Sequence, residues 1–192
     1  VVDGGVAPRR HRVERLHRGT LKTIDMRYRA DGGIDVAFDP PDDVTPIEPE
    51  LMAGAIDPLS SLVAMIVRAS DGGGCAGTLP AFDGKRRYDL VFTEMGSAML
   101  EPSRYSPYAG PARLCRMRRV PVAGDWDWDA ERGDKAPRER VVDLWLAAPV
   151  EGGPVVPVRA EGEVWVGRVY VHLAGTATDG ALPESVRREE DR

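Results

Sequence analysis

Alternation of apolar and polar residues near the start of the chain predicts a β-hairpin. Residues 20–28 and 34–39 both have the two-residue period of a half-buried strand, and the Asp-Gly-Gly sequence at 31–33 suits a turn between them. The alternating apolar positions are Ile24, Met26, Tyr28, Ile34, Val36 and Phe38. Pro40 and Pro41 end the second strand, because proline cannot donate a hydrogen bond to a strand ladder.

One segment has helical periodicity. Asp57 followed by Pro58 is a favourable helix start, and the glycines at 72–74 allow the chain to leave the helix. Apolar residues recur at helical spacing at Leu59, Leu62, Val63, Ile66 and Val67, and Ala64 and Met65 fill much of the remaining surface. We therefore predict one buried helix at about 58–69 that is apolar nearly all round.

Strand patterns return after this helix. An Asp83-Gly84 pair between two strand-like runs is the strongest hairpin signal in the chain, and alternation continues over 88–93. Further strands are predicted over 113–122, 142–148, 155–159 and 163–173. This order favours a mainly β fold, in which an antiparallel sheet curves around one helix, over a parallel α/β fold. We expect one domain over 1–177 and a polar tail over 178–192.

Composition narrows the class of protein. The chain has 192 residues, 42% of them hydrophobic, which is typical of a globular protein with a core of its own. Its net charge of −5 argues against a nucleic-acid partner, and no apolar run approaches the roughly 20 residues of a transmembrane helix. The chain opens at Val1 with neither an initiator Met nor a signal peptide, so the 192 residues need not be the whole gene product.

Arginine-rich segments at 9–18 and 113–119 offer two interpretations. Arginine can contact phosphate groups. Arginine that alternates with apolar residues is, however, more typical of the solvated face of a strand, and we favour that interpretation in an acidic chain.

The two cysteines, Cys75 and Cys115, are 40 positions apart. In a cytosolic protein they would be two buried thiols, whereas in an exported protein an even count suggests a disulfide, and the residues alone leave both open. There is no CxxC motif and no cluster of His and Cys, so we expect no metal site and no cofactor.

The residues that could carry catalysis do not form a recognisable motif. His11 and His17 lie in the Arg-rich start and are expected to be solvated, and helix capping accounts for Ser60 and Ser61. A hydrolase would need His172, in the last strand, within hydrogen-bond reach of a Ser, Asp or Glu. The Asp-Trp repeat at 125–129 could hold Ca²⁺ or a sugar, but a turn with partly buried tryptophans is favoured. We expect no enzyme.

An apolar helix in a curved sheet either fills the concave face as a plain core or covers an apolar cavity that could take an acyl chain. The plain core is the simpler interpretation. In the cavity alternative the lining residues are Leu59, Leu62, Met65, Ile66, Tyr88, Leu90, Phe92, Trp145 and Trp165.

Several strings resemble one family. They are DPLSSL at 57–62, Cys75 followed by FDGKRRYDL at 82–90, YAGP at 108–111 with Cys115, PVAG at 121–124 and PVR at 157–159. Their order and spacing, over about 10–175, resemble an uncharacterised family of exported proteobacterial proteins, a domain of unknown function. Its fold is similar to that of the periplasmic lipoprotein carriers of the LolA/LolB type.

The resemblance implies an exported protein of the periplasm or cell envelope, a disulfide between Cys75 and Cys115, and an antiparallel half-barrel with the helix on its concave side. Family members usually carry further strands upstream of the segment that matches 10–28, so the sheet is expected to lack its first strands. We expect a non-enzymatic protein that binds a lipidic or apolar ligand, such as a lipoprotein acyl chain. The alternative is an interaction or scaffold domain without a pocket, which an exposed apolar patch or an unpaired sheet edge would support. The oligomeric state is left open.

Overall fold

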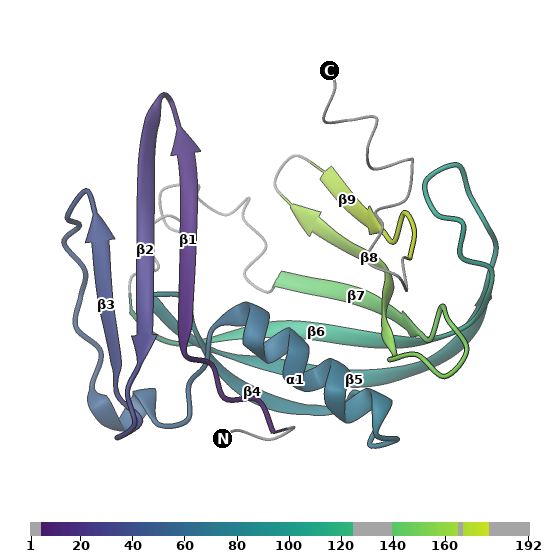
Figure 1. Ribbon diagram of the computed structural model, residues 1–192, viewed down its shortest axis with the longest axis horizontal. Coiled ribbons are helices and arrows are strands. Elements are labelled where there is room, and N and C mark those ends of the chain that lie inside the picture. Colours follow the sequence, from purple (N-terminus) through teal and green to yellow (C-terminus); the bar gives the residue numbers. More distant parts are fainter. Residues whose placement is uncertain (1–4, 125–139, 165–166, 177–192) are drawn as a thin grey trace. The chain divides into compact units, whose positions relative to one another are not determined.

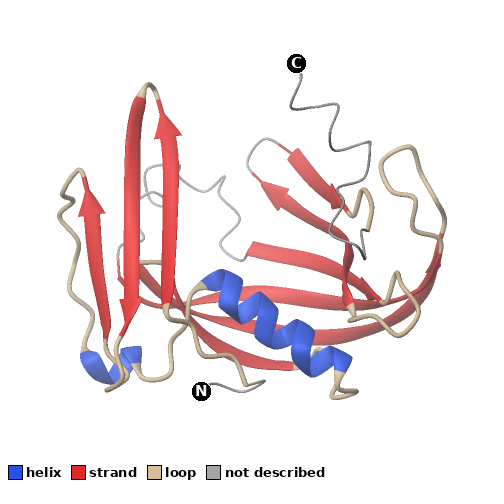
Figure 2. Ribbon diagram, viewed as in Figure 1, coloured by secondary structure: helices blue, strands red, loops and turns tan. Residues whose placement is uncertain are grey.

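The computed structural model describes residues 5–124, 140–164 and 167–176, and strands make up most of them (Figures 1 and 2). Two sheets, both antiparallel, and a single α-helix among the described residues confirm the predicted mainly β class. The elements in chain order are β1 Arg10–His17, β2 Thr20–Tyr28, β3 Ile34–Asp39, the 3-10 helix η1 Pro49–Met52, α1 Pro58–Ser70, β4 Gly77–Phe82, β5 Arg86–Leu100, β6 Gly110–Gly124, β7 Arg140–Ala147, β8 Val156–Val164 and β9 Gly167–His172.

Each sheet connects strands that are neighbours in sequence. The first has the order β1-β2-β3 and the second the order β4-β5-β6-β7-β8-β9. The Asp83-Gly84 sequence forms the predicted turn between β4 and β5, where the Asp83 carboxylate accepts hydrogen bonds from the backbone N–H groups of Lys85 and Arg86 at 3.1 and 2.9 Å. Because an Asx turn of this kind forms between neighbouring residues, the short Asp-Gly sequence was sufficient to predict it.

The chain divides into two compact units. Unit 1 comprises residues 1–65, 78–91 and 119–138, and unit 2 comprises residues 66–77, 92–118 and 139–192. A buried cluster in unit 1 joins Met26, Ala55 and Phe82, with Ile24, Ile34, Val36, Ile47 and Met52 packed against it. A second cluster, in unit 2, joins Ala112, Ala147 and Val158, with Leu100, Tyr108, Trp145, Val156 and Leu173 packed against it.

Helix α1 forms where it was predicted, but it buries only one face. Asp57 is its N-cap and accepts a hydrogen bond from the backbone N–H of Ser60 at 2.9 Å. The buried face consists of small or unbranched residues, namely Ser61, Ala64, Met65 and Ala69. The opposite face is aliphatic, and Leu59 and Val63 on it are 63% and 47% exposed. Because this helix is apolar nearly all round, its sequence did not show which face would be buried.

A disulfide joins Cys75 to Cys115, with a Cα–Cα distance of 6.2 Å. Both residues lie in unit 2 and are completely buried. Of the two alternatives that the residues left open, the disulfide is therefore the one that forms.

The last two strands differ from their predicted bounds. Strand β8 continues to Val164, although residues 160–163 lack apolar alternation, and β9 begins only at Gly167. Pairing with β7 on one side and β9 on the other explains the longer β8, because Glu161 and Gly162 are held by backbone bonds to both neighbours. Tertiary pairing here overrides the local pattern.

Candidate functional site

A buried polar cluster surrounds the start of α1 in unit 1. The Asp57 side chain is 2% exposed and lies 3.1 Å from Nδ1 of His11, whose side chain is 10% exposed. The other carboxylate oxygen accepts hydrogen bonds from the hydroxyls of Ser60 at 2.6 Å and Tyr28 at 3.3 Å. Burial, together with the Asp57 charge, raises the pKa of Tyr28.

The expectation that His11 is solvated is therefore wrong. His11 is the cross-strand partner of Met26, which is completely buried, so both side chains lie on the core side of the sheet. The alternation of Arg10, His11, Arg12 and Val13 carried this signal, but the arginines obscured it.

The geometry of this cluster does not suit nucleophilic catalysis. In a hydrolase the histidine lies between the nucleophile and the carboxylate. Here Ser60 and His11 both bind the same carboxylate of Asp57, and Ser60 is held by the helix cap. The cluster ties β1, β2 and α1 together, which is a structural role.

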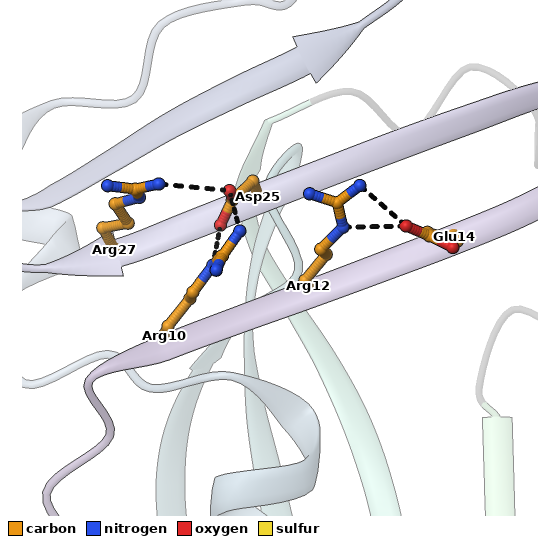
Figure 3. A network of polar contacts seen from close by, with 5 residues as sticks. All are labelled: Arg10, Arg12, Glu14, Asp25 and Arg27. Carbon is orange, nitrogen blue, oxygen red and sulfur yellow. Dashed lines mark hydrogen bonds and ion pairs between the residues drawn. The ribbon is translucent and has the colours of Figure 1, made fainter.

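The outer face of the β1–β2 hairpin carries paired charges (Figure 3). Arg10 binds the Asp25 carboxylate with two hydrogen bonds of 2.8 and 2.6 Å, and Arg27 lies 3.8 Å from the same group. Arg12 binds Glu14 at 2.8 Å. The Arg10 hydrogen bond lowers the pKa of Asp25. Arg10, Arg12 and Glu14 are exposed, so this face of β1 is the solvated strand face that was predicted.

Unit 2 contains a partly open pocket of about 450 Å³. Its walls come from the end of β5, the loop before β6, and strands β8 and β9. Met99, Leu100 and Val158 supply aliphatic surface, and Glu101, Ser103, Ser106 and Arg159 supply polar groups. Tyr105, Tyr108, Tyr170 and His172 complete the lining. A volume of this size is in the range of small-molecule sites.

Aromatic rings stack along this pocket. The ring of His172 lies between those of Tyr105 and Tyr170, with centroid distances of 5.9 and 6.3 Å and interplanar angles of 21° and 16°. Tyr170 and His172 share a face of β9 because they are two residues apart. The stacked rings give this side of the pocket a broad aromatic surface.

Guanidinium groups cover both ends of the stack. Cζ of Arg104 lies 4.5 Å from the Tyr105 ring centroid, and Cζ of Arg159 lies 5.4 Å from that of Tyr170. Arg159 also donates a 3.3 Å hydrogen bond to Glu161. Its Nε is buried and has no hydrogen-bond partner among the described residues, so one N–H of this guanidinium lacks an acceptor although its charge is paired with Glu161.

The residues proposed to line an apolar cavity do not lie in this pocket. Leu59, Leu62, Met65, Tyr88 and Leu90 belong to unit 1, whereas Ile66, Phe92 and Trp145 belong to unit 2. Four of them are buried: Met65, Tyr88, Leu90 and Phe92, at 0%, 4%, 5% and 3% exposure. Trp145 packs on the unit 2 cluster, Leu62 and Ile66 are half-buried, and Trp165 lies outside the described residues. Whether they enclose a cavity stays a prediction.

Sequence reasoning missed the pocket's own aromatic residues. The two-residue spacing of Tyr170 and His172 was visible, but nothing in the sequence placed Tyr105 next to them. The Asp-Trp repeat at 125–129 lies outside the described residues. Within the described ranges no group of His, Cys, Asp or Glu is arranged to hold a metal ion. No helix in that part of the chain has the length and apolar character to cross a membrane.

Comparison with known proteins gives one match. The sequence profile of a family described as "Protein of unknown function (DUF3108)" matches residues 1–174. No curated protein and no solved structure has a significant match to the chain. On this evidence, the chain belongs to the DUF3108 family of proteins of unknown function.

Proposed function

We propose that this chain is a non-enzymatic binding protein of the periplasm or cell envelope, and that it holds an amphipathic lipidic ligand in the unit 2 pocket. The observation that carries the proposal is the composition of that pocket. Aliphatic side chains and a stack of three rings form its walls, and the guanidinium of Arg159, one N–H of which lacks an acceptor, lies at one end of the stack. An acyl segment suits the walls, and an anionic head group suits the cation.

The size of the pocket limits the ligand and its affinity. Burying about six methylene groups contributes roughly 5 kcal/mol. Association itself costs several kcal/mol, so apolar contact alone gives weak binding. A charge-assisted bond to Arg159 would therefore contribute much of the specificity.

A non-enzymatic role is supported by the surroundings of His172. Its ring is stacked between two tyrosines, and no hydrogen bond joins it to a Ser, Asp or Glu in the described part of the chain. Ser106, a candidate nucleophile in the pocket lining, follows Tyr105 directly in the sequence. Its hydroxyl donates a hydrogen bond to the carbonyl of Leu173.

Placement in the envelope is supported by the buried disulfide, because disulfides persist in oxidising compartments. Fractionation of the native host, followed by alkylation of the denatured, unreduced protein, tests this. We expect an envelope fraction whose intact mass is unchanged by alkylation. Cytosolic protein that takes up two alkyl groups would contradict it.

Ligand binding can be tested with a fluorescent fatty acid, dansyl-labelled undecanoic acid, added to the purified chain. Met99→Ser and Arg159→Gln should each weaken binding about tenfold, equivalent to roughly 1.4 kcal/mol. Met95→Ser is the matched control for the first, because Met95 is also exposed on β5 but is not part of the pocket lining. Arg113→Gln, on β6, is the control for the second, because Arg113 is also paired with a glutamate but is not part of the pocket lining.

The head group is tested by replacing the carboxylate of the probe with a neutral amide. The amide probe should bind the wild type more weakly than the carboxylate probe does. The two probes should bind Arg159→Gln equally well. Absence of probe binding to the wild type, or equal loss in Met95→Ser and Met99→Ser, would refute the proposed pocket.

A scaffold role is the second candidate, and the position of β9 favours it. Among the described strands β9 is at the end of its sheet, and Val169 and Val171 are 45% and 62% exposed. An unpaired edge can accept a strand of a partner protein. A photo-crosslinker at position 171, used in the native host, should then capture one envelope protein. Arg168→Pro should abolish that product, because the register of β8 and β9 turns the N–H of Arg168 to the open edge. Crosslinking that survives this change would argue against strand pairing.

A further inference from the structure

The tip of the β1–β2 hairpin, residues 15–22, extends beyond the rest of its sheet (Figure 1). β2 pairs with β1 from Thr20, but it pairs with β3 only from Thr23 onward. The tip therefore projects by about three residues, or roughly 10 Å. Among the described residues, no third strand pairs with this tip.

The polarity of the two faces inverts at the tip. Below it, one face carries Arg10, Arg12, Glu14 and Asp25, and the other carries the core residues Ile24 and Met26. At the tip the charged face continues with the cross-strand pair Leu16 and Leu21, which are 72% and 52% exposed. The core face continues with the pair Arg15 and Lys22. Folding of the sheet does not require this inversion, because neither pair is buried.

Unpaired positive charge is also concentrated at the tip. The arginines lower on the hairpin are neutralised by Asp25 and Glu14 (Figure 3). In contrast, Arg15, Arg18 and Lys22 form no ion pair within the described part of the chain. Asp42 acts on Lys22 electrostatically, but its carboxylate is paired with Lys85. No acidic residue occurs between positions 15 and 24.

We propose that the hairpin tip docks on the surface of an anionic lipid bilayer, with Leu16 and Leu21 inserted at the boundary of the acyl chains and Arg15, Arg18 and Lys22 at the lipid head groups. Two adjacent leucines surrounded by cations complement such a surface in both polarity and charge. The projection of the tip matches the 5–10 Å depth of interfacial binding. The inference is independent of the unit 2 pocket, since residues 15–22 lie in unit 1.

An acidic protein is the main competing partner. It would satisfy the cations, but it offers no reason for two exposed leucines on a tip that is only one hairpin wide. A nucleic acid fits less well for the same reason, and the chain as a whole carries a net charge of −5. The bilayer accounts for both the leucines and the cations.

Flotation of the purified chain with phosphatidylcholine vesicles, with and without phosphatidylglycerol, tests the proposal. Binding should require phosphatidylglycerol and should fall as salt is added. The double variant Arg15→Gln/Arg18→Gln should reduce it about tenfold or more, given about fivefold per cation. Arg27→Gln/Arg168→Gln makes the same change of charge at exposed sites outside the tip and should bind like the wild type.

The leucines are tested in the same assay. Leu16→Ser/Leu21→Ser should bind at least tenfold more weakly, whereas Val120→Ser/Val122→Ser, an exposed aliphatic pair on β6, should have little effect. The fluorescence of the tryptophan introduced by Leu16→Trp should be quenched by bromine atoms in the acyl chains. Equal binding of the leucine double variant and the valine double variant would overturn the inference, as would no binding of the wild type to anionic vesicles. So would recovery of a soluble acidic protein as the tip's crosslinked partner from the native host.

Discussion

At the scale of single residues, the least expected feature is one carboxylate that serves three elements. Asp57 caps α1 and also binds His11 of β1 and Tyr28 of β2. The sequence showed the cap, because Asp before Pro is a local signal. It could not show the two cross-element contacts, because they depend on strand register and on how the hairpin packs against the helix start.

Gly84 shows how a single backbone position supports the packing of unit 1. Its φ is +97°, and a Cβ there would lie 2.6 Å from Cγ2 of Ile24. Gly152 also has a left-handed φ, of +71°, but has open space around it. Both positions favour glycine, and only the first also excludes a methyl group on steric grounds.

Gly84→Ala should therefore destabilise the protein more than Gly152→Ala. Strain in the left-handed region costs roughly 1–2 kcal/mol at both positions. The clash with Ile24 should add about 1–3 kcal/mol at Gly84 alone. Urea unfolding of the two variants measures the difference, and equal losses of stability would show that the β2 side chain moves aside.

At the scale of elements, the disulfide fixes the segment that follows α1 to β6. Cys75 lies between α1 and β4, and Cys115 lies within β6. Arg68 in the last turn of α1 donates a hydrogen bond to the carbonyl of Cys75 at 3.3 Å, so the helix end and the disulfide support each other. Pairing of the cysteines was implied by the family resemblance and is confirmed by the structure.

Removing the disulfide should lower the free energy of unfolding substantially. The 40-residue separation corresponds to roughly 4 kcal/mol in the chain-entropy model. Denaturant unfolding of Cys75→Ser/Cys115→Ser should show this loss, and reductant should not change the variant further. A wild type that keeps its unfolding midpoint after reduction would contradict the expected contribution.

At the scale of the whole molecule, the buried Tyr88 and the half-buried Tyr28 make the stability of the fold fall at alkaline pH. Burial raises the pKa of Tyr88 to about 12, with the Asp83 charge as a smaller cause. The pKa of Tyr28 is also raised, first by burial and then by Asp57. In the unfolded chain both phenols ionise near pH 10. Their neutral forms therefore favour the fold below that pH, and this contribution decreases as pH rises towards the folded-state pKa values.

We expect each tyrosine to cost roughly 1 kcal/mol of stability between about pH 9 and about pH 11. Urea unfolding at the two pH values measures the sum. Tyr88→Phe should lose less stability than the wild type over this interval, while its stability at the lower pH reports any loss of packing. An unchanged alkaline slope in Tyr88→Phe would mean that another group controls it.

The sequence by itself determined the mainly β class, the position of α1 and the turn between β4 and β5. These features follow from periodicity, capping and Asx-Gly chemistry, all of which act over a few neighbouring residues. Only the tertiary structure decided which face of α1 is buried, where β8 ends and which rings meet in the unit 2 pocket. The helix is apolar nearly all round, so local pattern could not select a face. Tyr105 meets His172 across 67 residues of chain, through a loop and strand pairing that no local signal encodes.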